Sequence, residues 1–130
     1  MRWILFAAAL ISTPAFASDW KIVSSGPKNG DVYIDVASAT RNGNKITVWE
    51  KWDQTIKKSK ETKNGKLVSE IKTRSTYDCS DQTVDILQSV YYDSDGNVIY
   101  TYTKPLFVQP TLIVPDTIGD GIARYVCELK

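Results

Sequence analysis

Most of this chain alternates between apolar and polar residues in short runs that end at turn residues. A period of two is typical of a β-strand, because successive side chains of a strand point to opposite faces of the sheet. The pattern predicts strands at residues 20–23, 32–36, 45–53, 67–79, 82–92 and 97–103. The predicted turns between them are Gly26-Pro27, Asn42-Gly43-Asn44, Asn64-Gly65 and Asp95-Gly96. The last of these turns is a strong two-residue hairpin signal.

A single helix is predicted near the end of the chain. Prolines interrupt the strand pattern, and a helical pattern follows at residues 116–127. Asp116 or Thr117 is a suitable N-cap, whereas Gly119 and Gly121 weaken the helix by about 1 kcal/mol each. The apolar stripe consists of Ile118, Ile122, Tyr125 and Leu129. The elements together predict an α+β, mainly β domain.

The predicted sheet has apolar side chains on both faces. The core-facing set is expected to be Ile46, Val48, Trp52, Val84, Ile86, Val90, Val98, Tyr100 and Tyr102. The opposite face then carries Trp49, Leu87, Tyr91 and Ile99. One short helix covers only one face. Either the sheet curls into a sandwich or barrel that buries both faces, or the second face binds a partner as a homodimer or ligand surface. A shift of one residue in any strand would exchange its faces.

The first seventeen residues have the features of a cleaved signal peptide. Arg2 gives a positive start, a short apolar segment follows, and Ala15-Phe16-Ala17 fits the small-residue rule for cleavage. An apolar segment needs about 20 residues to span a bilayer, and Pro14 interrupts this one. We therefore expect residues 1–17 to be removed. Residues 18–130 would then form one exported domain, without a transmembrane segment, in the periplasm or at the cell surface. No cysteine follows the expected cleavage site, so no lipid anchor is expected there.

Composition excludes the commonest catalytic and metal-binding arrangements. The 130 residues include 16 basic and 15 acidic residues and no histidine. No imidazole is therefore present as a general base, as the activator of a nucleophile or as a metal ligand. The net charge of +1 falls to zero once residues 1–17 are removed, which gives no bulk attraction to nucleic acid. We expect neither catalysis nor a bound metal or other cofactor.

The chain has two cysteines, Cys79 and Cys127. Exported proteins meet an oxidising compartment in which disulfides persist, so we expect these two residues to be joined. A bridge over this separation is worth about 4 kcal/mol in the chain-entropy treatment. Neither cysteine lies in a C-x-x-C motif or beside a basic partner, which are the features of a reactive thiol. The cysteines are expected to be structural.

The largest charge asymmetry lies in a polar segment after the third predicted strand. Its lysines, offset only by Glu61, are Lys57, Lys58, Lys60, Lys63 and Lys66. Such a cluster attracts acidic protein segments, heparin-like glycans or anionic lipid headgroups. It is also typical of a solvated hairpin loop, where lysines discourage edge-to-edge pairing of sheets. Nucleic acid is not an expected partner, because no aromatic residue interleaves with the lysines for base stacking.

Two groups of acidic residues have partial likeness to functional motifs. Residues 93–97 contain D-x-D-G, but tyrosines occupy the two positions where a calcium-binding loop needs carboxylates, so a hairpin turn is expected. The spacing of Asp78, Asp81 and Asp85 is compatible with an acid pair. Strand alternation is expected to separate these three, and no nucleophile accompanies them.

A series of motifs follows a recognisable order along residues 18–130. They are Trp20, the phrase Val32-Tyr33-Ile34-Asp35, the pattern of Arg41, Gly43 and Trp49, the pair Asp78-Cys79, a tyrosine-rich strand closed by D-x-D-G, and the segment Val114-Pro115-Asp116-Thr117-Ile118-Gly119 that leads to Val126-Cys127. Together these motifs resemble the surface-adhesin protein E family of Gram-negative surface and periplasmic proteins.

The resemblance implies a single antiparallel sheet of about six strands, a C-terminal helix packed on it, and a disulfide equivalent to Cys79–Cys127. It also implies dimer formation and the binding of host matrix or plasma proteins, without enzymatic activity. Two other functions stay open. One is a periplasmic inhibitor or immunity-type protein that acts on a cell-wall hydrolase. The other is a structural envelope protein that forms a homodimer.

Overall fold

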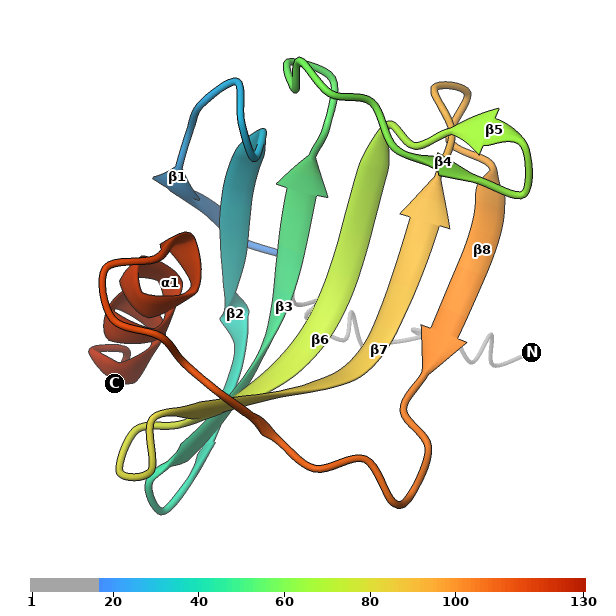
Figure 1. Cartoon of the computed structure of the whole chain (residues 1–130). Coiled ribbons are helices and arrows are strands. Elements are labelled where there is room, and N and C mark those ends of the chain that lie inside the picture. Colours follow the sequence, from blue (N-terminus) through green and yellow to red (C-terminus); the bar gives the residue numbers. More distant parts are fainter. Residues whose placement is uncertain (1–16) are drawn as a thin grey trace, which may run out of the picture.

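An antiparallel sheet with a helix on one face makes up residues 17–130, the part of the chain that this computed structural model describes (Figure 1). In spatial order, the main strands are β1 (Trp20–Ser24), β2 (Asp31–Asn42), β3 (Lys45–Asp53), β6 (Glu70–Asp78), β7 (Thr83–Tyr92) and β8 (Val98–Thr103). The remaining elements are β9 (Thr111–Leu112), which pairs with β7, the separate hairpin of β4 (Thr62–Lys63) and β5 (Lys66–Leu67), and α1 (Ile118–Cys127). The expected fold class is confirmed.

The sheet stays open within residues 17–130, because β1 and β8 are its two edges and do not pair with each other. The alternative of a sandwich or closed barrel is therefore not formed in this part of the chain. No helix in the same residues is long and apolar enough to cross a membrane. The expected signal peptide, residues 1–17, lies outside the described residues except for Ala17, and it stays a prediction.

The hydrophobic core lies between α1 and the strands nearest to it. Its buried members are Val32, Ile34, Ile46, Val48, Tyr77, Ile113, Ile122, Ala123 and Val126. Alternation along β3 puts Ile46 and Val48 in this core, with Trp52 packed against it, as the sequence predicts. Full burial of a side chain of this size is worth about 1.5–3 kcal/mol. We call the face that α1 covers the helix face and the opposite face, which carries Trp49 and Lys51, the open face.

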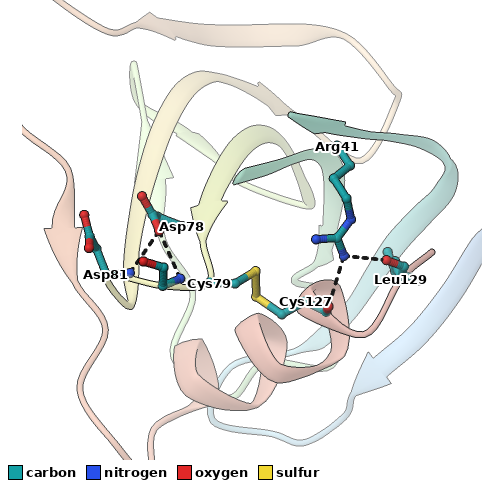
Figure 2. Close-up of a disulfide and its surroundings, with 7 residues drawn as sticks. Arg41, Asp78, Cys79, Asp81, Cys127 and Leu129 are labelled. Carbon is teal, nitrogen blue, oxygen red and sulfur yellow. Dashed lines mark hydrogen bonds between the residues drawn. A yellow bond between two sulfur atoms is a disulfide. The ribbon is translucent and has the colours of Figure 1, made fainter. Parts of the chain in front are cut away.

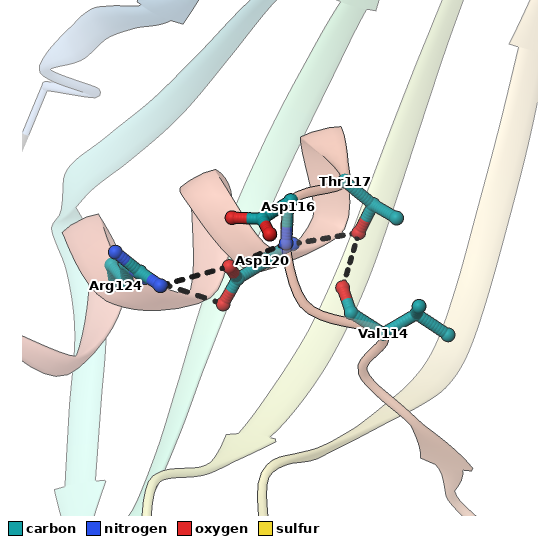
Figure 3. A network of polar contacts seen from close by, with 5 residues as sticks. All are labelled: Val114, Asp116, Thr117, Asp120 and Arg124. Atoms are coloured by element: carbon teal, nitrogen blue, oxygen red, sulfur yellow. Dashed lines mark hydrogen bonds and ion pairs between the residues drawn. The ribbon is translucent and has the colours of Figure 1, made fainter.

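The start of α1 follows the predicted capping pattern (Figure 3). Thr117 has an extended backbone, and its Oγ1 accepts a hydrogen bond from the Asp120 backbone N–H at 3.2 Å. The Asp120 carboxylate in turn accepts from the Asp116 N–H at 3.0 Å and pairs with Arg124 at 3.1 Å. These bonds satisfy N–H groups that have no partner inside a helix.

The other end of α1 is tied to the sheet by the predicted disulfide (Figure 2). Cys79, directly after β6, is bonded to Cys127, the last residue of α1, with 5.9 Å between the Cα atoms. Arg41 of β2 donates hydrogen bonds to the carbonyl oxygens of Cys127 at 3.2 Å and Leu129 at 2.8 Å. A cation at a helix C-terminus satisfies free carbonyl groups and complements the helix dipole. The helix is therefore held to the sheet at its C-terminal end and along its apolar stripe.

An inserted residue in β7 changes which side chains share a face. Arg74 pairs with Gln88 and Ser75 with Ile86, so Leu87 has no partner on β6. Because of this bulge, Ile86 and Tyr91 both point to the helix face, and Val90 points to the open face. This corrects the expected grouping of Val90 with the core-facing set.

The residues predicted to form one partner face are therefore separated. Tyr91 is aligned with Ile71 on the helix face, whereas Trp49 is aligned with Arg74 on the open face. Leu87 is the inserted residue of β7, and Ile99 lies at a second irregularity between β7 and β8. Trp49, Leu87, Tyr91 and Ile99 do not form a single surface.

Candidate functional site

A groove lies on the helix face over β7 and β8. These two strands stand on the side of the sheet away from α1 (Figure 1). The walls of the groove come from β7, β8, the β4–β5 hairpin and the segment that joins β8 to β9. The side chains that line it include Lys63, Ile86, Tyr91, Tyr100, Tyr102 and Val108, and its volume is about 340 Å³. We call this feature the tyrosine groove.

Two tyrosines and a lysine form the centre of the tyrosine groove. The rings of Tyr91 and Tyr100 meet edge to face, with 5.5 Å between their centroids. Lys63 Nζ lies 5.3 Å from the first centroid and 5.2 Å from the second. Partial burial raises the pKa of Tyr91 most, and the nearby carboxylate of Glu61 raises this pKa further. Tyr91 therefore stays neutral at physiological pH, and the rings of Tyr91 and Tyr100 hold the ammonium group by cation–π attraction.

The β4–β5 hairpin delivers Lys63 to this position. Its turn needs two residues with positive φ, and Asn64 (51°) followed by Gly65 (75°) supplies them, as the sequence predicts. Asn64 Nδ2 donates to the carbonyl oxygen of Ile99 in β8 at 2.6 Å. Val68, after the hairpin, is buried, and its N–H bonds the Glu61 carbonyl oxygen at 2.9 Å. The hairpin is thus attached to the sheet edge.

The segment after β8 leads to Val108, which lines the tyrosine groove, and we call this segment the rim. Leu106 is 103% and Phe107 82% exposed. Lys104 fixes the beginning of this segment, because its Nζ pairs with Asp85 Oδ2 at 2.7 Å and its N–H bonds the Leu87 carbonyl oxygen. The rim therefore presents two large apolar side chains from an anchored base.

Sequence reasoning missed most of this rim. It assigned Tyr100 and Tyr102 to the core and did not select Leu106 or Phe107. The sequence does contain a signal that these two residues are exposed, because Leu106 and Phe107 stand between Pro105 and Pro110. Prolines keep such a segment out of regular strands and helices, which are the elements that would bury it.

The five predicted lysines do not form one patch. Lys63 enters the tyrosine groove, and Lys66 lies opposite it in the β4–β5 hairpin. Lys60 Nζ is bound to the carbonyl oxygens of Thr55 at 2.6 Å and Gln54 at 3.3 Å. Of the other two, Lys58 is exposed, and its N–H bonds the Pro27 carbonyl oxygen near the β1–β2 turn, whereas Lys57 is half-buried. The segment that carries these five lysines, which we call the lysine segment, is therefore divided between the side of the sheet near β1 and β2 and the side near β8. Ligand binding by its lysines stays a prediction.

The predicted acidic motifs have structural roles. Asp93 Oδ1 accepts hydrogen bonds from the backbone N–H groups of Asp95 and Asn97, which confirms a hairpin turn. Asp78 accepts from two backbone N–H groups in the turn after β6. Asp78, Asp81 and Asp85 line one hollow, contrary to the expectation that strand alternation separates them. Within residues 17–130 no group of three or more His, Cys, Asp or Glu side chains could hold a metal ion.

A buried carboxyl group lies in the sheet outside the tyrosine groove. Glu50 is 3% exposed and accepts hydrogen bonds from the Tyr77 hydroxyl and, at 3.0 Å, from Trp52 Nε1. Burial raises the pKa of Glu50, and these hydrogen bonds offset only part of the effect. Burial and the adjacent carboxyl group also raise the pKa of Tyr77. This pair stabilises the core through neutral hydrogen bonds at low pH.

Comparison with known proteins identifies both a family and a fold. The family model for surface-adhesin protein E matches residues 20–128. The crystal structure of protein E from non-typeable Haemophilus influenzae aligns with a TM-score of 0.55 and 13% identity, over 91% of this chain and 81% of that chain. Crystal form II of Haemophilus influenzae protein E gives 0.56 and 15%, over 93% and 96%. At these identities the structural likeness concerns the fold. No curated protein sequence matches this chain.

Proposed function

Because this chain belongs to the surface-adhesin protein E family, we propose that it is an exported, non-catalytic protein that binds another protein through the tyrosine groove. Family membership supports a protein at the cell surface or outside the cell. The choice of this groove rests on the side chains that surround it.

The observation that carries the proposal is the group of large apolar side chains left exposed around the tyrosine groove. Ile86 (46%) and Tyr100 (39%) line the groove and are partly exposed, and Leu106 and Phe107, shortly before the lining residue Val108, are almost fully exposed. Large exposed apolar side chains gathered in one region mark interaction sites. Aromatic residues are enriched in protein interfaces, and a few of them supply most of the binding energy.

We propose a host matrix or plasma protein as the partner. The charge of Lys63 is offset by Glu61, its ion-pair partner at 3.7 Å, whereas Lys66 is exposed in the same hairpin. Lys66 adds positive charge near the groove, so the complementary surface would combine apolar and acidic side chains. Lys58, at the other end of the sheet, would contribute little to this interface.

Binding of residues 18–130 to a panel of immobilised matrix and plasma proteins tests the proposal. We expect Tyr100→Ala and Phe107→Ser each to weaken binding at least tenfold, as loss of an interface hot spot does. Ile22→Ser is the matched control, because Ile22 is 54% exposed in β1 at the opposite edge of the sheet. This control should bind like the wild type.

The outcomes separate the candidate functions. If both groove variants bind as well as the wild type, the tyrosine groove is not the binding surface. Binding to a purified cell-wall hydrolase, with no binding to the panel, would favour the inhibitor function instead. Sedimentation of the same proteins detects self-association, and a homodimer that Phe107→Ser dissociates would favour the structural function.

A further inference from the structure

The open face of the sheet carries a shallow trough that the proposed function does not use. The side chains that line it include Ser18, Trp20, Asp35, Trp49, Lys72 and Tyr92, and its volume is about 260 Å³. Trp20 lies in β1 and Tyr92 in β7, so the trough crosses four gaps between neighbouring strands. At about 4.8 Å per gap it extends over about 19 Å. An elongated ligand of linked rings matches this shape.

Strand register explains why these side chains share one face. Trp20 pairs with Asp35, Asp35 with Trp49, and Trp49 with Arg74. Directly paired residues of antiparallel strands point to the same side of a sheet. Every strand under the trough except β1 has a neighbour on both sides. The trough therefore offers side chains rather than free backbone groups, and a peptide strand would have no edge to join at its centre.

One cation, Lys72, lines the trough, and Lys51 and Arg74 lie beside it on the same face of the sheet. Lys51 and Lys72 are direct cross-strand partners, an arrangement that destabilises a sheet because like charges face each other. Lys72 has one acidic neighbour, Glu70, at 3.9 Å. Arg74, beside Trp49, is exposed and forms no ion pair with the other described residues. An anionic ligand would relieve the repulsion between these cations.

Aromatic rings hold the two lysines in place. Lys51 Nζ lies 4.7 Å from the ring centroids of both Trp20 and Tyr33, and Lys72 Nζ lies 5.3 Å from that of Tyr92. These contacts keep the ammonium groups among the rings instead of extended into solvent. The face therefore combines flat apolar surfaces with fixed cations.

One carboxylate lines the trough, and its charge is partly compensated. Asp35 is 6% exposed, and its Oδ1 accepts hydrogen bonds from the backbone N–H groups of Asp19 at 2.8 Å and Ala37 at 3.2 Å. Cleavage after Ala17, as the sequence predicts, would also place the α-amino group of Ser18 at this trough. That group would add one more cation to the trough.

We propose that this trough binds an acidic glycan, a chain of sugar rings that carry carboxylate or sulfate groups. The apolar face of a pyranose ring packs flat against the ring of a tryptophan or tyrosine. Anionic substituents pair with lysine ammonium and arginine guanidinium groups. Sugar hydroxyls find partners in Asp35 and Ser18 along the same trough. An exported protein meets such glycans at cell surfaces and in matrix.

Titration of residues 18–130 with a heparin hexasaccharide tests this proposal, with binding measured by calorimetry and by tryptophan fluorescence. Lys72→Glu and Trp49→Ala are each expected to weaken binding at least tenfold. Lys66→Glu makes the same charge change in the β4–β5 hairpin and should bind like the wild type. Maltohexaose, a neutral chain of equal length, should not bind. Circular dichroism checks that the variants are folded.

Three results would overturn the proposal. One is the absence of binding by the hexasaccharide. Another is a loss of binding in Lys66→Glu without any loss in Lys72→Glu, which would place the glycan on the lysine segment. The third is equally tight binding of a single-stranded DNA hexamer with the same dependence on the variants, which would show a general polyanion site. All trough variants leave the tyrosine groove unchanged, so this failure is distinct from a failure of the proposed protein binding.

Discussion

Removal of the disulfide between Cys79 and Cys127 should destabilise the fold mainly through the unfolded chain. The bridge spans 48 residues, and in the chain-entropy treatment a loop of this length stabilises the folded state by about 4 kcal/mol. A domain of this size has a total stability of about 5–15 kcal/mol. The double variant Cys79→Ala/Cys127→Ala should therefore lose a large fraction of its unfolding free energy, measured by urea unfolding at pH 7.

Wild-type protein in reductant is the matched control for this variant. Its unfolding free energy should fall by a similar amount, because the same constraint is lost. The helix should still form in both samples, since Ile122 and Val126 stay buried against the sheet and Arg41 still bonds the helix end. A loss below about 1 kcal/mol in the double variant would refute the entropic account. A loss in the double variant alone would indicate a packing defect instead.

Three further predictions concern the fold. Burial raises the pKa of Glu50 in the folded protein above its usual value of 4.5. The stabilising effect of protonated Glu50 is therefore complete below pH 4.5 and is lost as the pH rises through the folded pKa. The free energy of unfolding falls by up to about 1.4 kcal/mol per pH unit over this range. Glu50→Gln should remove this slope from urea unfolding between pH 4 and 8, and an unchanged slope would contradict the assignment. At Gly30 the φ is +76°, and Gly30→Ala would place a Cβ 2.1 Å from the Asp53 carbonyl oxygen. At Gly43 the φ is +63° and the surrounding space is open. Gly30→Ala should therefore cost more stability than Gly43→Ala. Equal melting temperatures for these two variants would count against the close approach. Thr117→Ala should cost about 1 kcal/mol through loss of the helix cap, seen in thermal unfolding, and no change would exclude a role for that bond.

Local patterns in the sequence predict the elements of this fold well. The strand at residues 45–53 has the expected bounds because Ile46, Val48 and Trp52 share one face and turn residues precede the strand. The helix starts where Thr117 can cap it, and its apolar stripe packs on the core. The disulfide follows from having two cysteines in an exported chain. These features depend on residues close in sequence or on a simple count.

The faces of β7 could not be predicted in the same way. The bulge at Leu87 is set by how β6 and β7 pair across the sheet, and nothing in the local pattern marks it. One inserted residue moved Tyr91 to the helix face and Val90 to the open face. The contact of Lys63 with Tyr91 and Tyr100 likewise depends on where a separate hairpin docks. The tyrosine groove is therefore a product of tertiary structure.

Mapping of the bound partner by NMR tests directly whether the tyrosine groove is the binding surface. Isotope-labelled residues 18–130 would be titrated with the tightest-binding protein of the matrix and plasma panel. We expect the largest chemical-shift changes at Tyr91 and Tyr100 in the tyrosine groove and at Phe107 in the rim. Changes confined to the open face at Trp49 and Lys72, or to α1, would contradict this expectation.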